Sequence, residues 1–362
     1  MLDNSKERID ILFRNSYSIK ESILISSNET SQDTYDLTFS IPTYNRDTYL
    51  FELLESINNL VDSEKVTFEV VITDNTREKE HYEIIKNYLE KCRFNYRYYK
   101  NLNNLGGYGN WNQSILLGKG NYYVLVHDDD LIHSQFLTAF RFCISQNVKF
   151  DAIAIPFSRF FEDSYETFEK RLFDLRHFTI KKIKKIAQIR TKYSMTLGWI
   201  INRDTILETG LFPETGGHFT EDQFFATKMI YKLNVYEFNC CMYGYRTCQD
   251  ADSMKRKDLW NQHYVDNYFL KKQYINLYCK KNRIKEKFLI ILLNIKFFMD
   301  LKVFEKTFYG EMNLDYNEIV ATTRLPLYSK LLYPLMYSLY WGNKKIKKII
   351  DRIYKYRIEK NI

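Results

Sequence analysis

The sequence predicts an α/β fold with a mostly parallel sheet, followed by a helical C-terminal region. Between about residues 37 and 130, short apolar runs alternate with longer segments in which apolar residues recur every three or four positions. Strands that alternate with helices are joined by right-handed crossovers, which make the strands parallel. From about Asp250 onward the strand pattern fades, and long helical segments remain.

The individual elements follow from the local pattern of apolar residues, which form short runs in strands and recur with a helical period in helices. The expected strands are 37–41, 68–73, 96–99 and 122–127, and the expected helices are 48–60, 80–92, 109–118, 222–233, 259–278, 284–301 and 327–356. Residues 1–36 are expected to form a helical extension that ends in the polar linker SSNETSQD at 26–33.

Composition and cysteine spacing restrict the class of protein. Hydrophobic residues make up 45% and charged residues 27%, which is a globular composition. The six cysteines lack C-x-x-C spacing and two are adjacent, which argues against a disulfide framework and a zinc site and favours a reducing cytosol. The N-terminus has mixed charge and the apolar stretches are short, so we expect neither a secretory signal nor a transmembrane helix.

The net charge of +8 is concentrated near the C-terminus. Residues 341–362 hold eight Lys and Arg against two acids, and residues 326–341 before them are apolar and rich in Tyr. This combination suits binding in the plane of an anionic membrane, although a packed helix with a solvated basic face has the same pattern. No nucleic-acid partner is expected, because a basic tail alone lacks a module that reads bases.

Three consecutive acids, Asp128, Asp129 and Asp130, directly follow an apolar strand and are the most informative local feature. Adjacent carboxylates at the end of a buried strand raise one another's pKa unless a cation holds them. A divalent metal that carries a phosphate is the natural partner, and a solvated loop or a helix cap before Ser134 is the alternative.

Other unusual residues lie next to the neighbouring strands. The segment PTYNR at 42–46 follows the first strand, Asp74 ends the second, and NLGGYGNWN at 104–112 precedes the third helix. In open parallel sheets ligands bind beyond the carboxyl ends of the strands. The glycines would let a ligand approach the backbone, and a helix N-terminus favours phosphate, although a structural turn is equally consistent with them.

These segments, in this order, resemble the family 2 glycosyltransferases, whose catalytic domain has the GT-A fold. The matching pieces are FSIPTYNR at 39–46, VVITDN at 70–75, NLGGYGNWN at 104–112, HDDD at 127–130, and GLF at 210–212 leading to TED at 220–222. The resemblance implies a GT-A catalytic domain at 37–253, between the extension at 1–36 and a helical region at 254–362 with its membrane-proximal tail.

The resemblance also implies a set of site residues. The triplet would hold Mg²⁺ or Mn²⁺ against the donor's diphosphate, Asp222 would be the catalytic base, and Glu221 would contact the acceptor. Acids after Thr220 would also stabilise the start of a helix, and both roles are compatible. The donor, expected to be a uridine diphosphate sugar, would contact Pro42, Thr43, Tyr44, Asn45, Asp74, Asn104, Gly107, Asn110, Asp128 and Arg246.

Two positions depart from the family pattern. His127 stands where the D-x-D element usually begins, so the ion could be held by Asp129, or by Asp128 and Asp130. Cys248 stands where the family carries a histidine, which leaves that role open to Arg246, His218 or His263. Separately, Trp199 could stack on a sugar or belong to the core.

Together these features favour an inverting, metal-dependent hexosyl- or N-acetylhexosaminyltransferase. It would move a sugar from a nucleotide donor to a hydroxyl of a glycan or lipid-linked acceptor in surface-polysaccharide synthesis, on the cytoplasmic face of a bacterial plasma membrane. A non-catalytic sugar-nucleotide or glycan-binding protein of the same fold is the alternative. A nucleotidyltransferase is disfavoured, because the first loop is not rich in Gly, Arg and Lys, as expected of one.

Overall fold

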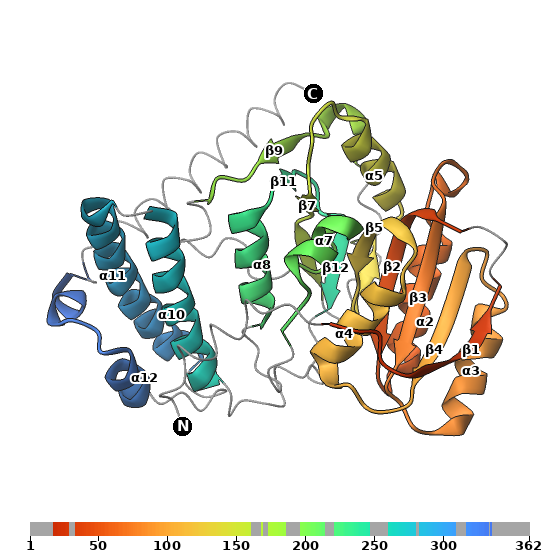
Figure 1. Cartoon of the computed structure of the whole chain (residues 1–362), viewed down its shortest axis with the longest axis horizontal. Coiled ribbons are helices and arrows are strands. Elements are labelled where there is room, and N and C mark those ends of the chain that lie inside the picture. The colour runs from red at the N-terminus through yellow and green to blue at the C-terminus, as the bar shows by residue number, and fades with distance from the viewer. Residues whose placement is uncertain are drawn as a thin grey trace, which may run out of the picture. The chain divides into compact units, whose positions relative to one another are not determined.

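The computed structural model describes residues 17–28, 33–160, 168, 173–185, 196–213, 221–246, 260–279, 282–308, 316–332 and 334. The chain divides into two compact units, one of residues 7–255 and one of residues 256–362 together with residues 1–6. The elements of each unit are labelled in Figure 1.

The first unit is built on a nine-stranded sheet with the strand order β1-β4-β3-β2-β5-β10-β7-β11-β9. Its strands β4 (Asn95–Asn101), β3 (Phe68–Asp74), β2 (Tyr35–Thr43) and β5 (Gly120–Leu125) are parallel to their neighbours in this group. Thr43 pairs with Asp74, so the carboxyl ends of β2 and β3 meet at one edge. The predicted α/β fold with a central parallel sheet is confirmed.

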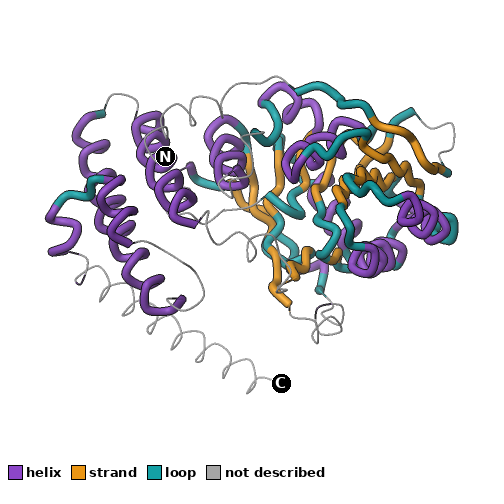
Figure 2. Tube along the Cα trace, turned by 90° about the horizontal axis from the view of Figure 1, so that it is seen from below, coloured by secondary structure: helices purple, strands orange, loops and turns teal. Residues whose placement is uncertain are grey.

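Helices cover this parallel region on both sides of the strand layer (Figure 2). They are α2 (Asp47–Asn58), α3 (Lys79–Leu89), α4 (Gly106–Leu117) and α5 (Phe136–Ser145). All residues of β3 and all but one of β2 are buried, as expected for parallel strands that are covered on both faces. Both faces of these strands are thus covered, and a polar residue such as Glu69 is buried there with its carboxylate hydrogen-bonded to Thr38 and Arg97.

Beyond β5 the sheet continues through short strands that the sequence pattern did not indicate. Strand β10 (Ile200–Asn202) is antiparallel to both β5 and β7 (Ala152–Ala154). The remaining elements here are β11 (Val235–Phe238), β9 (Ile180–Lys182), the helices α7 (Arg203–Thr209) and α8 (Glu221–Lys232), and the 3₁₀ turn Leu175–His177. A second 3₁₀ turn, Ser63–Lys65, lies between α2 and β3.

A second, three-stranded sheet holds the segment that follows the acidic triplet. It contains β6 (Leu131–Ile132), β12 (Tyr243–Arg246) and β8 (Phe157–Phe160), with β12 in the middle. Because β6 begins directly after Asp130 and pairs with β12, this small sheet fixes one end of the triplet turn.

The expected N-terminal extension and linker are wrong at residues 22–27, which form strand β1 (Ser22–Ser27). This strand pairs antiparallel with β4 and forms one edge of the sheet. The exposed backbone groups of β4 offer a ladder to any neighbouring segment, and this tertiary partner is invisible to local periodicity. Residues 17–21, 28 and 33–34 are not helical either, and β2 begins at Tyr35. Residues 1–16 and 29–32 of the expected extension and linker lie outside the described residues.

The second unit is helical, as predicted, with α10 (Trp260–Cys279), α11 (Arg283–Phe308) and α12 (Tyr316–Thr323). The Tyr268 hydroxyl donates to Asn294 Oδ1 (2.9 Å), and Asn294 Nδ2 donates to the Tyr328 hydroxyl (2.6 Å). Among the residues that the structure describes, no helix is both long enough and apolar enough to cross a bilayer. The basic tail at 341–362 lies outside them.

Candidate active site

An amide network joins the loops at the carboxyl ends of β2, β3 and β4. Asn101 Nδ2 donates to Oδ1 of Asn75 (2.9 Å) and of Asn110 (2.8 Å). Asn110 Nδ2 donates in turn to the carbonyls of Thr43 (3.1 Å) and Thr73 (3.0 Å). Asn110, a predicted donor contact, is only 3% exposed, so its side chain holds these loops together.

Asp74 ends β3 at the predicted edge, but its carboxylate is fully buried and engaged within the protein. Oδ1 accepts from the backbone N of Thr76 (2.7 Å), and Oδ2 accepts from the Tyr98 hydroxyl (2.6 Å). His81 Nε2 lies 3.0 Å from the same Oδ2, and His81 Nδ1 lies 2.5 Å from Asp47 Oδ1. Asp74 therefore anchors the loop after β3.

His81 was missed by the sequence analysis, and only its place early in the helix after Asp74 could have indicated it. Burial lowers the pKa of His81, but the carboxylates of Asp74 and Asp47 outweigh this effect and raise the pKa overall. Through these two carboxylates the ring links the end of β3 to the start of α2, the helix that follows the first loop.

The other predicted donor contacts differ in exposure. Pro42 is buried in β2, Tyr44 is 52% exposed, and Asn45 is exposed with a left-handed φ of +53°. Asn104 and Gly107 are exposed at the start of α4, where Asn104 Oδ1 caps the backbone N two residues later (2.9 Å). A Cβ at Gly107 would meet no atom within 4 Å, so internal packing does not require glycine there.

The first two acids of the triplet share one arginine. Asp128 Oδ2 accepts from the Thr43 hydroxyl (2.8 Å) and the Tyr44 backbone N (3.3 Å). Arg46 Nη1 lies 3.3 Å from Asp128 Oδ1 and 2.7 Å from Asp129 Oδ2. Asp128 is therefore held by the first loop.

Asp130 faces the small sheet instead. Its carboxylate accepts from the Tyr243 hydroxyl and from the Arg246 backbone N (2.8 Å). Burial raises the pKa of Asp130 well above its ordinary value, and the Asp129 carboxylate adds to the shift. Burial and Asp129 likewise raise the pKa of Asp128 to about 7, although Arg46 opposes the shift. A further cation nearby would stabilise the ionised form of each carboxylate.

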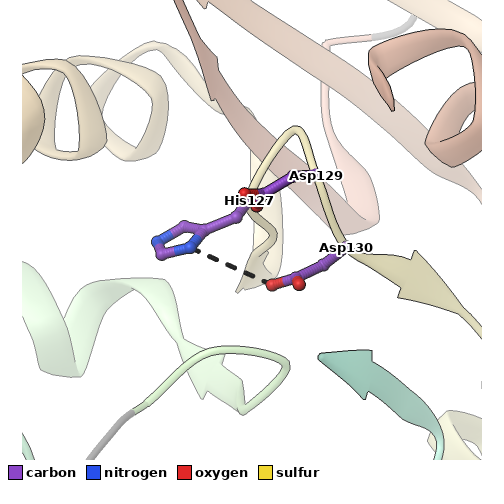
Figure 3. A group of neighbouring side chains, drawn as sticks. All are labelled: His127, Asp129 and Asp130. Carbon is purple, nitrogen blue, oxygen red and sulfur yellow. Dashed lines mark ion pairs between the residues drawn. The ribbon is translucent and has the colours of Figure 1, made fainter. Parts of the chain in front are cut away.

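The candidate metal group consists of His127, Asp129 and Asp130 (Figure 3). Each offers one ligand atom, and these atoms all lie within 4.8 Å of one another. His127 Nδ1 lies 3.9 Å from Asp130 Oδ2. Carboxylate oxygens suit Mg²⁺ and Mn²⁺, whereas an imidazole nitrogen favours transition metals, so the donor set fits Mn²⁺ better than Mg²⁺.

The sequence left open whether Asp129, or Asp128 together with Asp130, would hold the ion. It joins Asp129 and Asp130 with His127, the residue that replaces the usual first acid, and it leaves out Asp128. Which of these side chains bind an ion stays a prediction.

Arg246, predicted to bind phosphate, is only 5% exposed and clamps the triplet turn. Its Nε donates to the Asp129 carbonyl (2.7 Å), and its Nη2 pairs with Glu52 of α2. The guanidinium carbon lies 4.6 Å from the centre of the Tyr49 ring and 4.9 Å from that of Phe160. The sequence analysis missed this sandwich, because its members come from three distant elements.

Glu221 and Asp222 begin α8. Burial raises the pKa of Asp222 to about 8, Glu221 adds to the shift, and a hydrogen bond with the Tyr108 side chain opposes it. Asp222 Oδ1 is buried, with no hydrogen-bond partner within the described part of the chain. A desolvated carboxylate with an available oxygen and a pKa near neutrality is suited to accept a proton.

A row of aromatic rings joins Asp222 to the triplet turn. Tyr108, which bonds to Asp222, lies 4.6 Å from Trp111 between ring centres, and Trp111 lies 4.6 Å from His127. Burial raises the pKa of Tyr245, and Asp130, Asp129 and Asp222 all add to that shift, which places these acids around one side chain. The sequence analysis quoted the segment that holds Tyr108 and Trp111 but gave neither residue a role.

The structure describes two of the remaining residues that the sequence singled out, Trp199 and His263. Trp199 is 3% exposed and belongs to the core. His263 lies in α10 of the other unit. His218, Thr220 and Cys248 lie outside the described residues.

Residues 38–195 match the family model described as Glycosyl transferase family 2. Residues 38–195 thus belong to a family 2 glycosyltransferase domain. The matched part of this domain includes the loops after β2, β3 and β4 and the whole triplet turn. Asp222 and Arg246 lie beyond the matched residues.

Known proteins to which this chain is similar include a sequence relative and a solved structure. Abequosyltransferase RfbV of Salmonella typhimurium (strain LT2) is 36% identical over 96 residues, which are 26% of this chain and 28% of that protein. The crystal structure of S. aureus TarS 1-349 in complex with UDP has a TM-score of 0.55 at 17% identity, over 84% of this chain and 86% of that chain. The first match thus spans just over a quarter of the relative, and the second shows that the fold is shared.

Proposed function

We propose that the chain is an inverting, metal-dependent glycosyltransferase that moves a sugar from a nucleotide-diphosphate sugar to a hydroxyl acceptor. The observation that supports this most directly is the link between the His127, Asp129 and Asp130 group and the desolvated Asp222 through Tyr108 and Trp111. Sugar transfer needs both parts, because charge builds on the leaving diphosphate while the acceptor hydroxyl loses its proton.

The side chains have separate roles in the proposed reaction. Asp222, once ionised at a pH near or above its pKa of about 8, accepts the proton of the acceptor hydroxyl. The hydroxyl oxygen attacks the anomeric carbon from the face opposite the diphosphate, which inverts the configuration. Tyr108 orients Asp222 through their hydrogen bond. His127, Asp129 and Asp130 would hold Mn²⁺ or Mg²⁺, which when bound neutralises charge on the diphosphate.

The loops after β2, β3 and β4 are the proposed nucleotide site. A uridine diphosphate sugar is the first donor to test, because the TarS structure with this fold was solved with UDP. In this proposal the exposed residues contact the donor and the buried ones fix the loops. The exposed set is Tyr44, Asn45, Asn104 and Gly107, and the buried set is Pro42, Thr43, Asp74, Asn110, Asp128 and Arg246.

For the acceptor we propose a glycan or lipid-linked glycan in surface-polysaccharide synthesis. The matched relative is named an abequosyltransferase, which is a sugar-transferring activity of that protein. The basic segment at 341–362 would bind the cytoplasmic membrane surface and bring the active site to such an acceptor.

The test is turnover by the purified full chain on a panel of nucleotide sugars, measured as nucleotide release with Mn²⁺ and after chelation. We expect release to require the ion and to fall by about 10²-fold or more in Asp222→Asn, with donor affinity retained. Asp204→Asn, which removes an exposed acid from the first turn of α7, is the matched control. Donor binding with no turnover in the wild type would favour the non-catalytic alternative.

A further inference from the structure

Arg46 occupies a position between the first loop and the candidate metal group. Its Nη1 lies 2.7 Å from Asp129 Oδ2 and 3.3 Å from Asp128 Oδ1. The arginine side chain is 24% exposed, against 8% for Asp128 and 10% for Asp129. One guanidinium therefore neutralises two buried acids from a more exposed position.

A metal ion and this guanidinium would need the same carboxylate. Asp129 belongs to the candidate metal group with His127 and Asp130, and its Oδ2 is the oxygen that Arg46 contacts. Arginine stays protonated at any physiological pH, so it would repel an ion that binds the same side chain. Simultaneous occupation is disfavoured by this repulsion.

The triplet turn does not depend on Arg46 for its shape. Asp128 keeps its bonds from Thr43 and Tyr44, and the Asp129 carbonyl is held by Arg246 Nε at 2.7 Å. The Asp130 carboxylate is fixed by the backbone N of Arg246. The guanidinium could therefore leave while the backbone of the turn and the carboxylates of Asp128 and Asp130 stay in place.

The diphosphate of the proposed donor is a second anion that Arg46 can bind. It follows Asn45, whose exposed backbone is left-handed, and it stands at the start of α2 beside the loop proposed to contact the donor. Guanidinium groups bind phosphate oxygens in a bidentate manner, and such charge-assisted bonds are among the stronger hydrogen bonds in proteins. A donor diphosphate would accept the arginine that the ion releases.

We propose that Arg46 is an internal cation that the metal ion displaces from Asp129, and that the released side chain then binds the donor's diphosphate. This inference rests on the proposed function. It assigns Arg46 a role in coupling the two binding events, so that ion and nucleotide each favour the binding of the other. Arg46 is thus a positioning residue with opposite effects on the two ligands.

The test measures Mn²⁺ and UDP binding separately by titration calorimetry on the full chain. Without nucleotide, we expect Arg46→Gln to bind Mn²⁺ about two- to fivefold more tightly than the wild type, because the guanidinium no longer competes with the ion for Asp129. With saturating Mn²⁺, we expect the same variant to bind UDP about tenfold more weakly. Arg46→Lys should keep the competing charge and lose most of the UDP affinity.

Arg141→Gln is the control, since Arg141 pairs with Asp62 at 3.5 Å on the surface and is 43% exposed. An Mn²⁺ affinity in Arg46→Gln that is unchanged or weaker would overturn the displacement, provided that its thermal unfolding matches the wild type. If Arg46→Gln unfolds early, Arg46→Lys decides: UDP affinity equal to the wild type overturns the proposal. Absence of UDP binding by the wild type with Mn²⁺ would instead remove the proposed function.

Discussion

Replacing Asp222 by asparagine should make the protein more stable, and increasingly so as the pH rises. Burial raises the pKa of this carboxyl to about 8 from an ordinary value of 3.8, and the neighbouring Glu221 adds to the shift. The folded state therefore keeps a proton that the unfolded chain loses. The stabilisation associated with that proton is complete below about pH 4 and is lost as the pH rises through about 8.

The magnitude follows from one proton of difference between the folded and unfolded states. Each pH unit between these two pKa values lowers the unfolding free energy of the wild type by about 1.4 kcal/mol relative to a variant without the group. Between pH 5 and pH 7, the advantage of Asp222→Asn should therefore grow by about 2.7 kcal/mol.

The assay is urea denaturation of the wild type and of Asp222→Asn at pH 5, 6 and 7, followed by circular dichroism. Asp204→Asn controls for the loss of an acidic side chain from the first turn of a helix. A difference between wild type and Asp222→Asn that stays constant from pH 5 to pH 7 would refute the reasoning, because Asp222 would then be ionised in the folded protein.

Three further changes probe other parts of the site. His81→Gln should lower the unfolding free energy by about 1–3 kcal/mol at pH 6 and by less at pH 9, because a histidine whose pKa is raised loses its stabilising proton as the pH rises; urea denaturation at both values measures this. Gly198→Ala should cost about 2–4 kcal/mol in thermal unfolding, since Gly198 has a φ of +71° and a Cβ there would lie 2.5 Å from the Tyr243 ring. His127→Asp should shift the ratio of Mn²⁺ to Mg²⁺ affinity toward Mg²⁺ by about tenfold in competition titrations, because an oxygen replaces the imidazole ligand.

For each of these three predictions there is a result that would contradict it. Equal losses at pH 6 and pH 9 would show that the His81 bridge is not ionic. Gly107→Ala is the control for Gly198→Ala and should leave stability nearly unchanged, because a Cβ at Gly107 meets no atom within 4 Å. An unchanged metal preference in His127→Asp would exclude His127 from the ion site.

The sequence predicted the central parallel strands and the segments of the site, because both depend on local patterns. Apolar residues such as Phe39, Val70 and Ile72 are concentrated in β2 and β3, whose ends were predicted to within two residues. Strand β1 was missed because its runs of Ser and Ile acquire a strand structure only beside β4. The very short strands β7 and β10 carry too few residues to establish a period.

The sequence alone placed Asp128, Asp129 and Asp130 in one loop but could not say where each side chain points. That direction was decided by partners far along the chain, with Thr43 and Arg46 on one side and Tyr243 and Arg246 on the other. The same holds for Asp74, which the sequence predicted to be a ligand contact. In the tertiary structure its carboxylate is buried and contacts His81 and Tyr98. Local sequence determined which carboxylates reach the sheet edge, and only tertiary packing decided which of them are neutralised internally and which are left for a ligand.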